Sequence, residues 1–193
     1  MVTEDDSEVP WSVAWSAEQS FQLQPSRDFP GMVELDQVQA RGQGEPCFAA
    51  IHVTRQRRGM IELLCHVCGK PTTPDDRYIF PVASGGLVTL LDGTQQYGCN
   101  VPPMHHACAH RAAETCPHLA KVREQPLRCS EDEGRLIHRT DVTPGLEGLV
   151  DSLPPGVEVV FSCYRLYGAA FTAEVTRARE SWEAAVLGRR SPA

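Results

Sequence analysis

The stretch Cys65-His-Val-Cys68-Gly69, followed 36 residues later by His105-His-Ala-Cys108, decides the fold of this chain. Thiolate and imidazole are donors that Zn²⁺ prefers, and a spacer of two residues lets both side chains of a pair point at one tetrahedral centre. The alternative is four unrelated residues in a chain with eight cysteines. A glycine after the first pair and a helix start at the second favour zinc, so the sequence predicts one structural Zn²⁺ bound by Cys65, Cys68, His105 and Cys108.

The beginning of the chain lacks a secretory pattern. It reads Met1-Val-Thr-Glu-Asp-Asp6, with no basic segment and no apolar segment after it. No stretch approaches the length of an apolar membrane span. We therefore expect a cytoplasmic protein with no membrane contact, in a compartment where thiols stay reduced and a cysteine pattern indicates metal binding.

Charge is distributed unevenly along the 193 residues. Residues 1–40 carry a net charge of −7, residues 41–128 of +3 and residues 129–193 of −3. A protein that binds many phosphates would show a strong basic face, so weak or no nucleic-acid binding is expected. The one local exception is Arg55-Gln-Arg57-Arg58, which is either a solvated turn or a phosphate-contacting patch.

The pattern divides the chain into three parts. Residues 1–40 are expected to form an acidic, loosely ordered N-terminal arm. Trp11 and Trp15 lie four apart, so they are expected to share one face of a short helix that docks either on the domain itself or on a partner. Residues 41–128 form the zinc-binding domain, and residues 129–193 form an α/β extension packed on it. An arm of this kind is suited to a basic protein partner.

Two apolar runs precede the first pair of ligands, and two more lie between the pairs. Residues 48–53 and 60–64 are expected to be strands joined by a basic turn, and residues 77–82 and 87–91 to form a hairpin or small meander with a further turn at Asp92-Gly93. The sequence then predicts a helix over residues 105–115, which Pro117 ends. A Cys-x2-Cys turn (a zinc knuckle), a hairpin and a helix thus follow one another along the chain. This order predicts an α+β protein built on a zinc treble clef.

The C-terminal part continues this α+β pattern. Thr143-Pro144 is expected to start a short helix, and residues 157–164 form a buried strand. A final amphipathic helix follows Gly168, with apolar residues at helical spacing, which are Phe171, Val175, Ala178, Trp182 and Ala185. The aromatic side chains on this helix are assigned to the core and not to a cofactor site.

Residues 60–120 resemble a set of bacterial and phage Cys-rich proteins. The shared pattern is C-x2-C-G, then P-P-x-H-x2-C-A, then C-P-x-L, which here is Cys65 to Gly69, Pro102 to Ala109 and Cys116 to Leu119. The resemblance implies zinc binding and a treble clef, and it implies no substrate.

A second, more distant similarity is to HNH endonucleases, whose zinc-bound members carry their catalytic residues on a treble clef. The segment from Arg77 to Gly86 is similar to their hairpin, and the segment from Asn100 to Cys108 to their asparagine and second ligand pair. Tyr78 stands where the general base belongs and Arg77 where the acid belongs, and His110 is displaced by one position. The similarity therefore implies a degenerate HNH-like module.

Further metal donors surround the predicted helix, namely Cys99, His106, His110, Cys116 and His118. They suggest a second metal site, because His106 and His110 lie four apart on one helical face. The H-E-x2-H arrangement of metalloproteases is absent, since position 107 is alanine. In the competing interpretation, Cys116 packs as a small apolar residue and the histidines are hydrogen-bonding groups.

Two classes of function follow from these patterns. The first is a non-enzymatic interaction or regulatory module with a protein partner, because no complete catalytic constellation is visible. The alternative is a zinc-dependent hydrolase or a divergent HNH-type nuclease that uses the cluster of His106, His110, Cys116 and His118.

Overall fold

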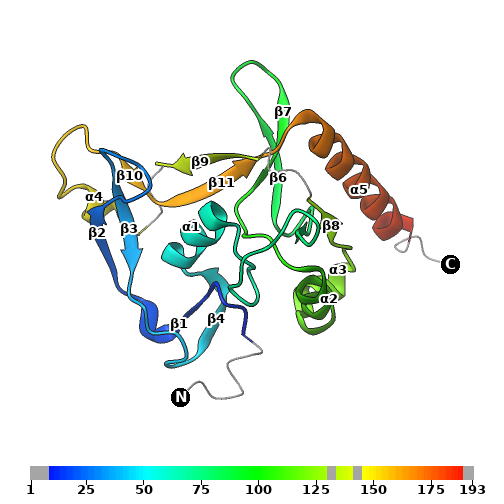
Figure 1. Cartoon of the computed structure of the whole chain (residues 1–193), viewed down its shortest axis with the longest axis horizontal. Helices are drawn as coiled ribbons and strands as arrows, with labels where there is room; N and C mark the ends of the chain where they lie inside the picture. Colours follow the sequence, from blue (N-terminus) through cyan, green and yellow to red (C-terminus); the bar gives the residue numbers. More distant parts are fainter. Residues whose placement is uncertain (1–8, 130–133, 141–144, 189–193) are drawn as a thin grey trace.

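The fold is α+β, as predicted. The computed structural model describes residues 9–129, 134–140 and 145–188 (Figure 1). Within these ranges the strands form four small sheets, which surround the central helix α1 (Val53–Glu62). None of the described helices has both the length and the apolar character needed to cross a membrane.

The N-terminal region forms strands from Val13 onward. β1 (Val13–Trp15) pairs with β4 (Pro46–Ile51), and β2 (Phe21–Pro25) with β3 (Val33–Gln37), which also pairs in parallel with β10 (Val159–Val160). A 3-10 turn, η2 (Ser16–Glu18), follows β1. The prediction of a loosely ordered arm is therefore wrong for residues 9–40, and so is the helix expected to carry Trp11 and Trp15. Residues 1–8 lie outside the described part.

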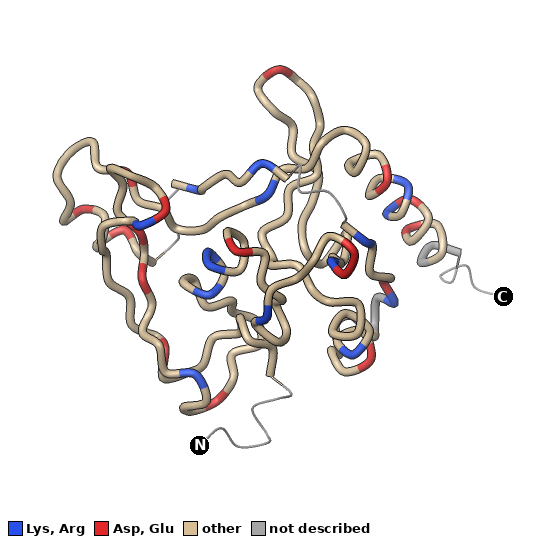
Figure 2. The backbone as a smooth tube through the Cα atoms, viewed as in Figure 1, with Lys and Arg blue, Asp and Glu red and all other residues tan. Residues whose placement is uncertain are grey.

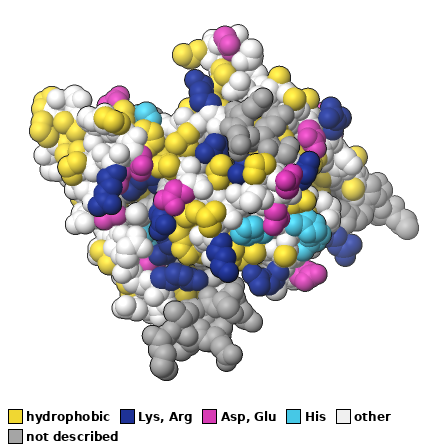
Figure 3. Space-filling view, in the orientation of Figure 1, with side chains coloured by type: hydrophobic (Ala, Val, Ile, Leu, Met, Phe, Trp, Pro, Cys, Tyr) yellow, Lys and Arg dark blue, Asp and Glu magenta, His cyan; other side chains and the backbone are white. Residues whose placement is uncertain are grey.

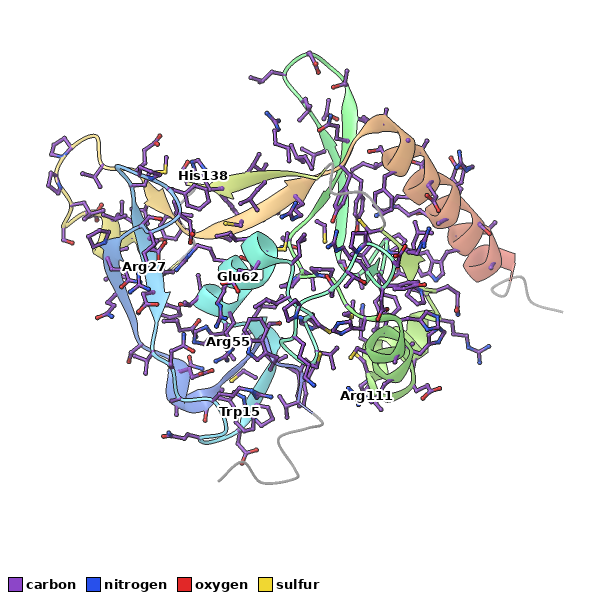
Figure 4. All side chains as sticks on the ribbon, viewed as in Figure 1. Trp15, Arg27, Arg55, Glu62, Arg111 and His138 are labelled. Atoms are coloured by element: carbon purple, nitrogen blue, oxygen red, sulfur yellow. The ribbon has the colours of Figure 1, made fainter. Side chains whose placement is uncertain are left out.

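Long-range ion pairs explain this order. Arg55 Nη2 lies 2.6 Å from Glu18 Oε2, and Arg57 Nη2 lies 3.1 Å from Glu34 Oε1, with all four side chains buried. Two acidic residues of the expected loose arm therefore form ion pairs with two arginines of α1, the helix that follows β4 in the sequence. Arg55 reaches from α1 toward the N-terminal strands, where Trp15 lies (Figure 4).

Helix α1 replaces two predicted features, the basic turn at residues 55–59 and the strand at 60–64. His52 Nδ1 accepts the Arg55 N–H and caps the helix, and Leu63 ends it in the left-handed region at φ 55°. Arg55 and Arg57 lie two positions apart and so project from different sides of the helix, yet both are buried because each pairs with a buried glutamate. The first predicted strand is confirmed as β4.

The β6–β7 hairpin is the most prominent projection of the molecule (Figure 1). β6 (Gly85–Thr89) and β7 (Gln95–Cys99) are antiparallel, with the predicted turn at Asp92-Gly93, where Gly93 has φ 83°. The four-stranded sheet runs β6-β7-β11-β9, with β11 (Ser162–Leu166) and β9 (Arg135–Arg139). β5 (Tyr78–Ile79), expected to belong to the hairpin, instead pairs with β8 (Leu127–Arg128).

Helices complete the C-terminal half. α2 (His106–Thr115) ends before Pro117, as predicted, and Pro117 starts α3 (Pro117–Val122). The predicted strand at residues 157–164 is divided into β10 and β11, and α4 (Glu147–Val150) is one turn long. The cap expected at Thr143-Pro144 lies outside the described residues. The final helix is confirmed as α5 (Ala169–Gly188), with Phe171 and Val175 buried.

The sheets join segments that the predicted domain boundaries would separate. β3 pairs with β10 across both boundaries, and β7 pairs with β11 across the second. Apolar residues of β7 and α5 also share one buried cluster with Tyr167, the residue after β11, and this cluster includes Tyr97 and Phe171. Acidic and basic residues are interspersed over the elements, and both signs occur along α5 (Figure 2).

Candidate metal centre

The first ligand pair lies in a tight turn that follows α1. The Gly69 N–H donates to the Cys65 carbonyl at 2.8 Å, and the Cys65 N–H donates to the Lys70 carbonyl at 2.7 Å. Gly69 has φ 71°, a conformation that a residue with a Cβ rarely adopts. The turn therefore depends on this glycine, and it directs Cys65 and Cys68 to the same side.

The second pair lies at the start of α2. His105 is the N-cap residue and Cys108 lies in the first turn, so both side chains leave the helix near its N-terminus. Asp76 Oδ1 accepts the His106 N–H at 2.6 Å and holds this end of the helix. The His66 N–H donates to the Pro103 carbonyl at 2.7 Å, which joins the two pairs through the backbone.

The four predicted ligands meet in the structure. The donor atoms of Cys65, Cys68, His105 and Cys108 all lie within 4.8 Å of one another. A tetrahedral zinc with sulfur at about 2.3 Å and nitrogen at about 2.0 Å spaces its ligand atoms roughly 3.5 to 3.8 Å apart. Cys68 Sγ lies 3.4 Å from His105 Nδ1, close to that spacing. The cluster therefore has the dimensions of a Cys3His metal site.

The orientation of His105 matches that of a metal ligand. Its Nε2 donates to the Pro71 carbonyl at 3.0 Å, so this nitrogen carries the hydrogen in the neutral ring. Nδ1 is then left with a free lone pair, and it is the nitrogen that faces the thiols. A carbonyl that fixes the tautomer of a ligating histidine is the usual companion of a metal site.

The electrostatics of the thiols also fit a cation. Burial raises the pKa of Cys65, while backbone N–H groups of Cys68, His105 and Val67 hydrogen-bond its sulfur and oppose that rise. Burial, together with the charges of Cys65 and Cys68, raises the pKa of Cys108 to about 12. Three thiolates this close repel one another, and a divalent ion at their centre would turn the repulsion into attraction.

The N-terminal region covers the first pair, which the sequence did not indicate. The Trp11 N–H donates to the Val67 carbonyl at 2.8 Å and the Ser12 N–H to the His66 carbonyl at 3.1 Å. Ser12 Oγ also hydrogen-bonds His66 Nδ1. A Cβ added to Gly69 would lie 2.7 Å from Trp11 Cγ, so the indole packs directly on the turn. Backbone carbonyls and long-range packing leave no local signal in a sequence.

The five further donors are not brought together. Cys99 is buried in a different apolar cluster from Cys116, and its Sγ donates to the Val101 carbonyl at 3.0 Å. His118 is exposed on α3. His106 and His110 do meet, with 3.0 Å between their Nε2 atoms. Among the residues that the structure describes, no second group of three or more metal donors is assembled.

The HNH-like positions carry no acid–base pair. Arg77 is buried, and its Nε donates to Thr72 Oγ1 at 3.1 Å. The Tyr78 ring packs on His106, with 4.9 Å between the ring centroids. Both residues thus support the loop and the helix around the cluster.

Comparison of the chain with known protein families, curated proteins and solved structures found no match. The interpretation of the centre therefore depends on its own geometry. A Cys3His group of this size can hold one metal ion with four protein donors.

Proposed function

We propose that the protein is a zinc-binding module of the treble-clef type and that it acts as a non-enzymatic interaction or regulatory protein. The observation that carries the proposal is the Cys3His cluster, with its four donor atoms within 4.8 Å and His105 held in the ligating tautomer. Four protein donors complete a tetrahedral zinc, whereas catalytic zinc sites keep one position open for water. The ion would then be structural.

The order of the elements supports the treble clef. Cys65 and Cys68 lie in a glycine turn, the β6–β7 hairpin follows, and His105 and Cys108 lie at the start of α2. The metal would join two segments whose apolar contacts in this region come from one small buried cluster around Phe80, Met104 and Ala109. In so small a cluster, metal binding contributes a large share of the folding free energy.

Zinc content and stability of Cys68→Ser test this role. Wild type should carry one zinc per chain, and the variant should lose zinc and the folded structure of the middle of the chain, residues 65–119, together, because structural zinc contributes on the order of 10 kcal/mol to the folding of such modules. Cys47→Ser is the matched control, since Cys47 lies on β4 outside the cluster. Freshly purified wild type without zinc would refute the proposal.

The projecting hairpin is the surface that best supports a protein partner. Leu87 and Val88 are consecutive, so they face opposite sides of the strand, yet they are 39% and 40% exposed. Leu91, at the tip, is fully exposed. Apolar side chains on both faces and at the tip are suited to insertion between apolar groups of a partner protein.

Site-specific photo-crosslinking tests this surface in cells. A photoreactive phenylalanine analogue replacing Leu91 should give a discrete protein adduct, and Val88→Ser in the same chain should remove it. The same analogue at Ala120, an exposed position on α3, is the control. Equal adducts from both positions would contradict a partner site on the hairpin.

A further inference from the structure

His106 and His110 form a pair on the exposed side of α2. They are four residues apart, so their side chains project from the same helical face. Their ring centroids are 4.3 Å apart, and the two Nε2 atoms approach to 3.0 Å. Histidine side chains gather on the face shown in Figure 3. Both residues are exposed, unlike Cys65 and Cys108 of the Cys3His cluster.

The separation of the two nitrogens fits a shared metal ion. Metal–nitrogen bonds of about 2.0 to 2.1 Å place the two ligand atoms roughly 2.8 to 3.0 Å apart at a right angle and 3.3 to 3.4 Å apart at a tetrahedral angle. In the structure a hydrogen bond of 3.0 Å joins the two Nε2 atoms, and this separation already matches the right-angled arrangement. Tetragonal Cu²⁺ and Ni²⁺ have this angle, and imidazole is a suitable ligand for both.

Neighbouring groups hold the pair before any ion binds. Asp76 accepts the His106 N–H at 2.6 Å, and the Tyr78 ring lies against the His106 ring at 4.9 Å. The same helical turn carries Cys108, which anchors α2 at the Cys3His cluster. A chelating pair whose backbone is already ordered loses less entropy on binding than a flexible one.

We propose that His106 and His110 form a second, exchangeable site for a divalent transition-metal ion, with Nε2 of each ring as ligand. Water completes the coordination, because Cys99 and Cys116 are directed into apolar clusters. The site differs from the hydrolytic centre considered from the sequence, since it has two protein donors and no glutamate between the two histidines. Ions should bind in the order Cu²⁺, then Ni²⁺ and Zn²⁺.

Ni²⁺ titration of the zinc-loaded full chain tests the site. Wild type should bind one equivalent of Ni²⁺ by calorimetry and be retained without a tag on immobilised Ni²⁺. His110→Ala should weaken Ni²⁺ binding at least tenfold, while zinc content stays at the wild-type value. His106→Ala should give the same loss. His118→Ala removes an exposed histidine outside the pair and should bind Ni²⁺ like wild type.

The results separate this site from the zinc centre. Equal Ni²⁺ affinity in wild type and His110→Ala would overturn the proposal, as would an equal loss in His118→Ala. Zinc content is measured on the same samples, so failure of the Ni²⁺ site leaves the test of the Cys3His cluster unaffected. If His110→Ala unfolds or loses zinc, the Ni²⁺ affinity of His106→Ala is the deciding measurement. The proposal is overturned if His106→Ala binds Ni²⁺ as tightly as wild type.

Discussion

Glu18 shows how one buried carboxylate organises the N-terminal region. It is 0% exposed and lies against the Arg55 guanidinium, and its oxygens also accept the N–H groups of Trp15 and Ala40, both at 2.9 Å. Burial by itself would raise the pKa of Glu18. The hydrogen bonds from Arg55, Ala40 and Trp15 outweigh that effect and hold the pKa below its ordinary value of 4.5.

Replacing Glu18 by glutamine should destabilise the protein strongly. The variant leaves Arg55 buried without its counter-charge, and breaking a buried pair in this way costs about 3 to 5 kcal/mol. Glu62→Gln is the matched control, because Glu62 pairs with Arg58 on the same helix but the two side chains are 47% and 60% exposed. It should change the unfolding free energy by less than about 1 kcal/mol. Urea denaturation measures both, and similar costs would contradict the role of Glu18.

Acid should remove the contribution of Glu18. Its folded-state pKa lies below the unfolded value, so the stabilisation is fully present above about pH 4.5 and is lost as the pH falls through the folded pKa. The free energy of unfolding of wild type should therefore decline below about pH 4.5. Glu18→Gln should show a shallower decline in the same range. Parallel pH profiles in the two proteins would show that Glu18 does not titrate in this way.

Among the elements, the turn after α1 depends on a glycine for two separate reasons. Gly69 has φ 71°, and a Cβ at this position would lie 2.7 Å from Trp11 Cγ. Gly93, in the β6–β7 turn, has φ 83°, but no atom lies within 4 Å of the place that a Cβ would take there. A comparison of alanine substitutions at Gly69 and Gly93 therefore separates the free-energy cost of the left-handed backbone from the cost of steric crowding.

Gly69→Ala should cost more stability than Gly93→Ala. The left-handed conformation costs about 1 to 2 kcal/mol in both variants, and displacing Trp11 adds about 1 to 3 kcal/mol at residue 69. Chemical denaturation gives the two free energies, and the fluorescence of the tryptophans should change in Gly69→Ala alone. Equal costs without a change in fluorescence would argue against the packing of Trp11 on the turn.

For the whole molecule, the metal cluster links regions that are distant in the sequence. Trp11 and Ser12 donate to the carbonyls of Val67 and His66, so the N-terminal region depends on the shape of the turn. Chelation of zinc should increase amide hydrogen exchange at Trp11, Ser12 and His66. Amides in the β9–β11 ladder should stay protected, because that pairing does not involve the cluster. A uniform loss of protection would contradict this local linkage.

Nucleic-acid binding should be weak and sensitive to salt. The chain has a net charge of −7, and Arg55 and Arg57 are buried in ion pairs with Glu18 and Glu34. The basic cluster expected from the sequence is thus not available to phosphates. A plot of log affinity against log salt should have a slope of −3 or shallower, at roughly 0.9 per neutralised phosphate. Nanomolar DNA binding at physiological salt would contradict this prediction.

The features that the sequence determined by itself depend on short spacings along the chain. The two ligand pairs, the Asp92-Gly93 turn and the apolar period of α5 each involve residues within a few positions of one another. Local backbone geometry is sufficient to specify such features, which is why they were predictable without coordinates.

Tertiary structure alone decided the features that join distant residues. Glu18 and Arg55 lie 37 positions apart, and their pairing converts an expected loose arm and an expected basic turn into strands and a buried helix face. β5 takes β8 as its partner, and His105 takes its tautomer from the Pro71 carbonyl. A buried charge or a backbone carbonyl is satisfied by whichever group the fold brings near it, and no local pattern encodes that group.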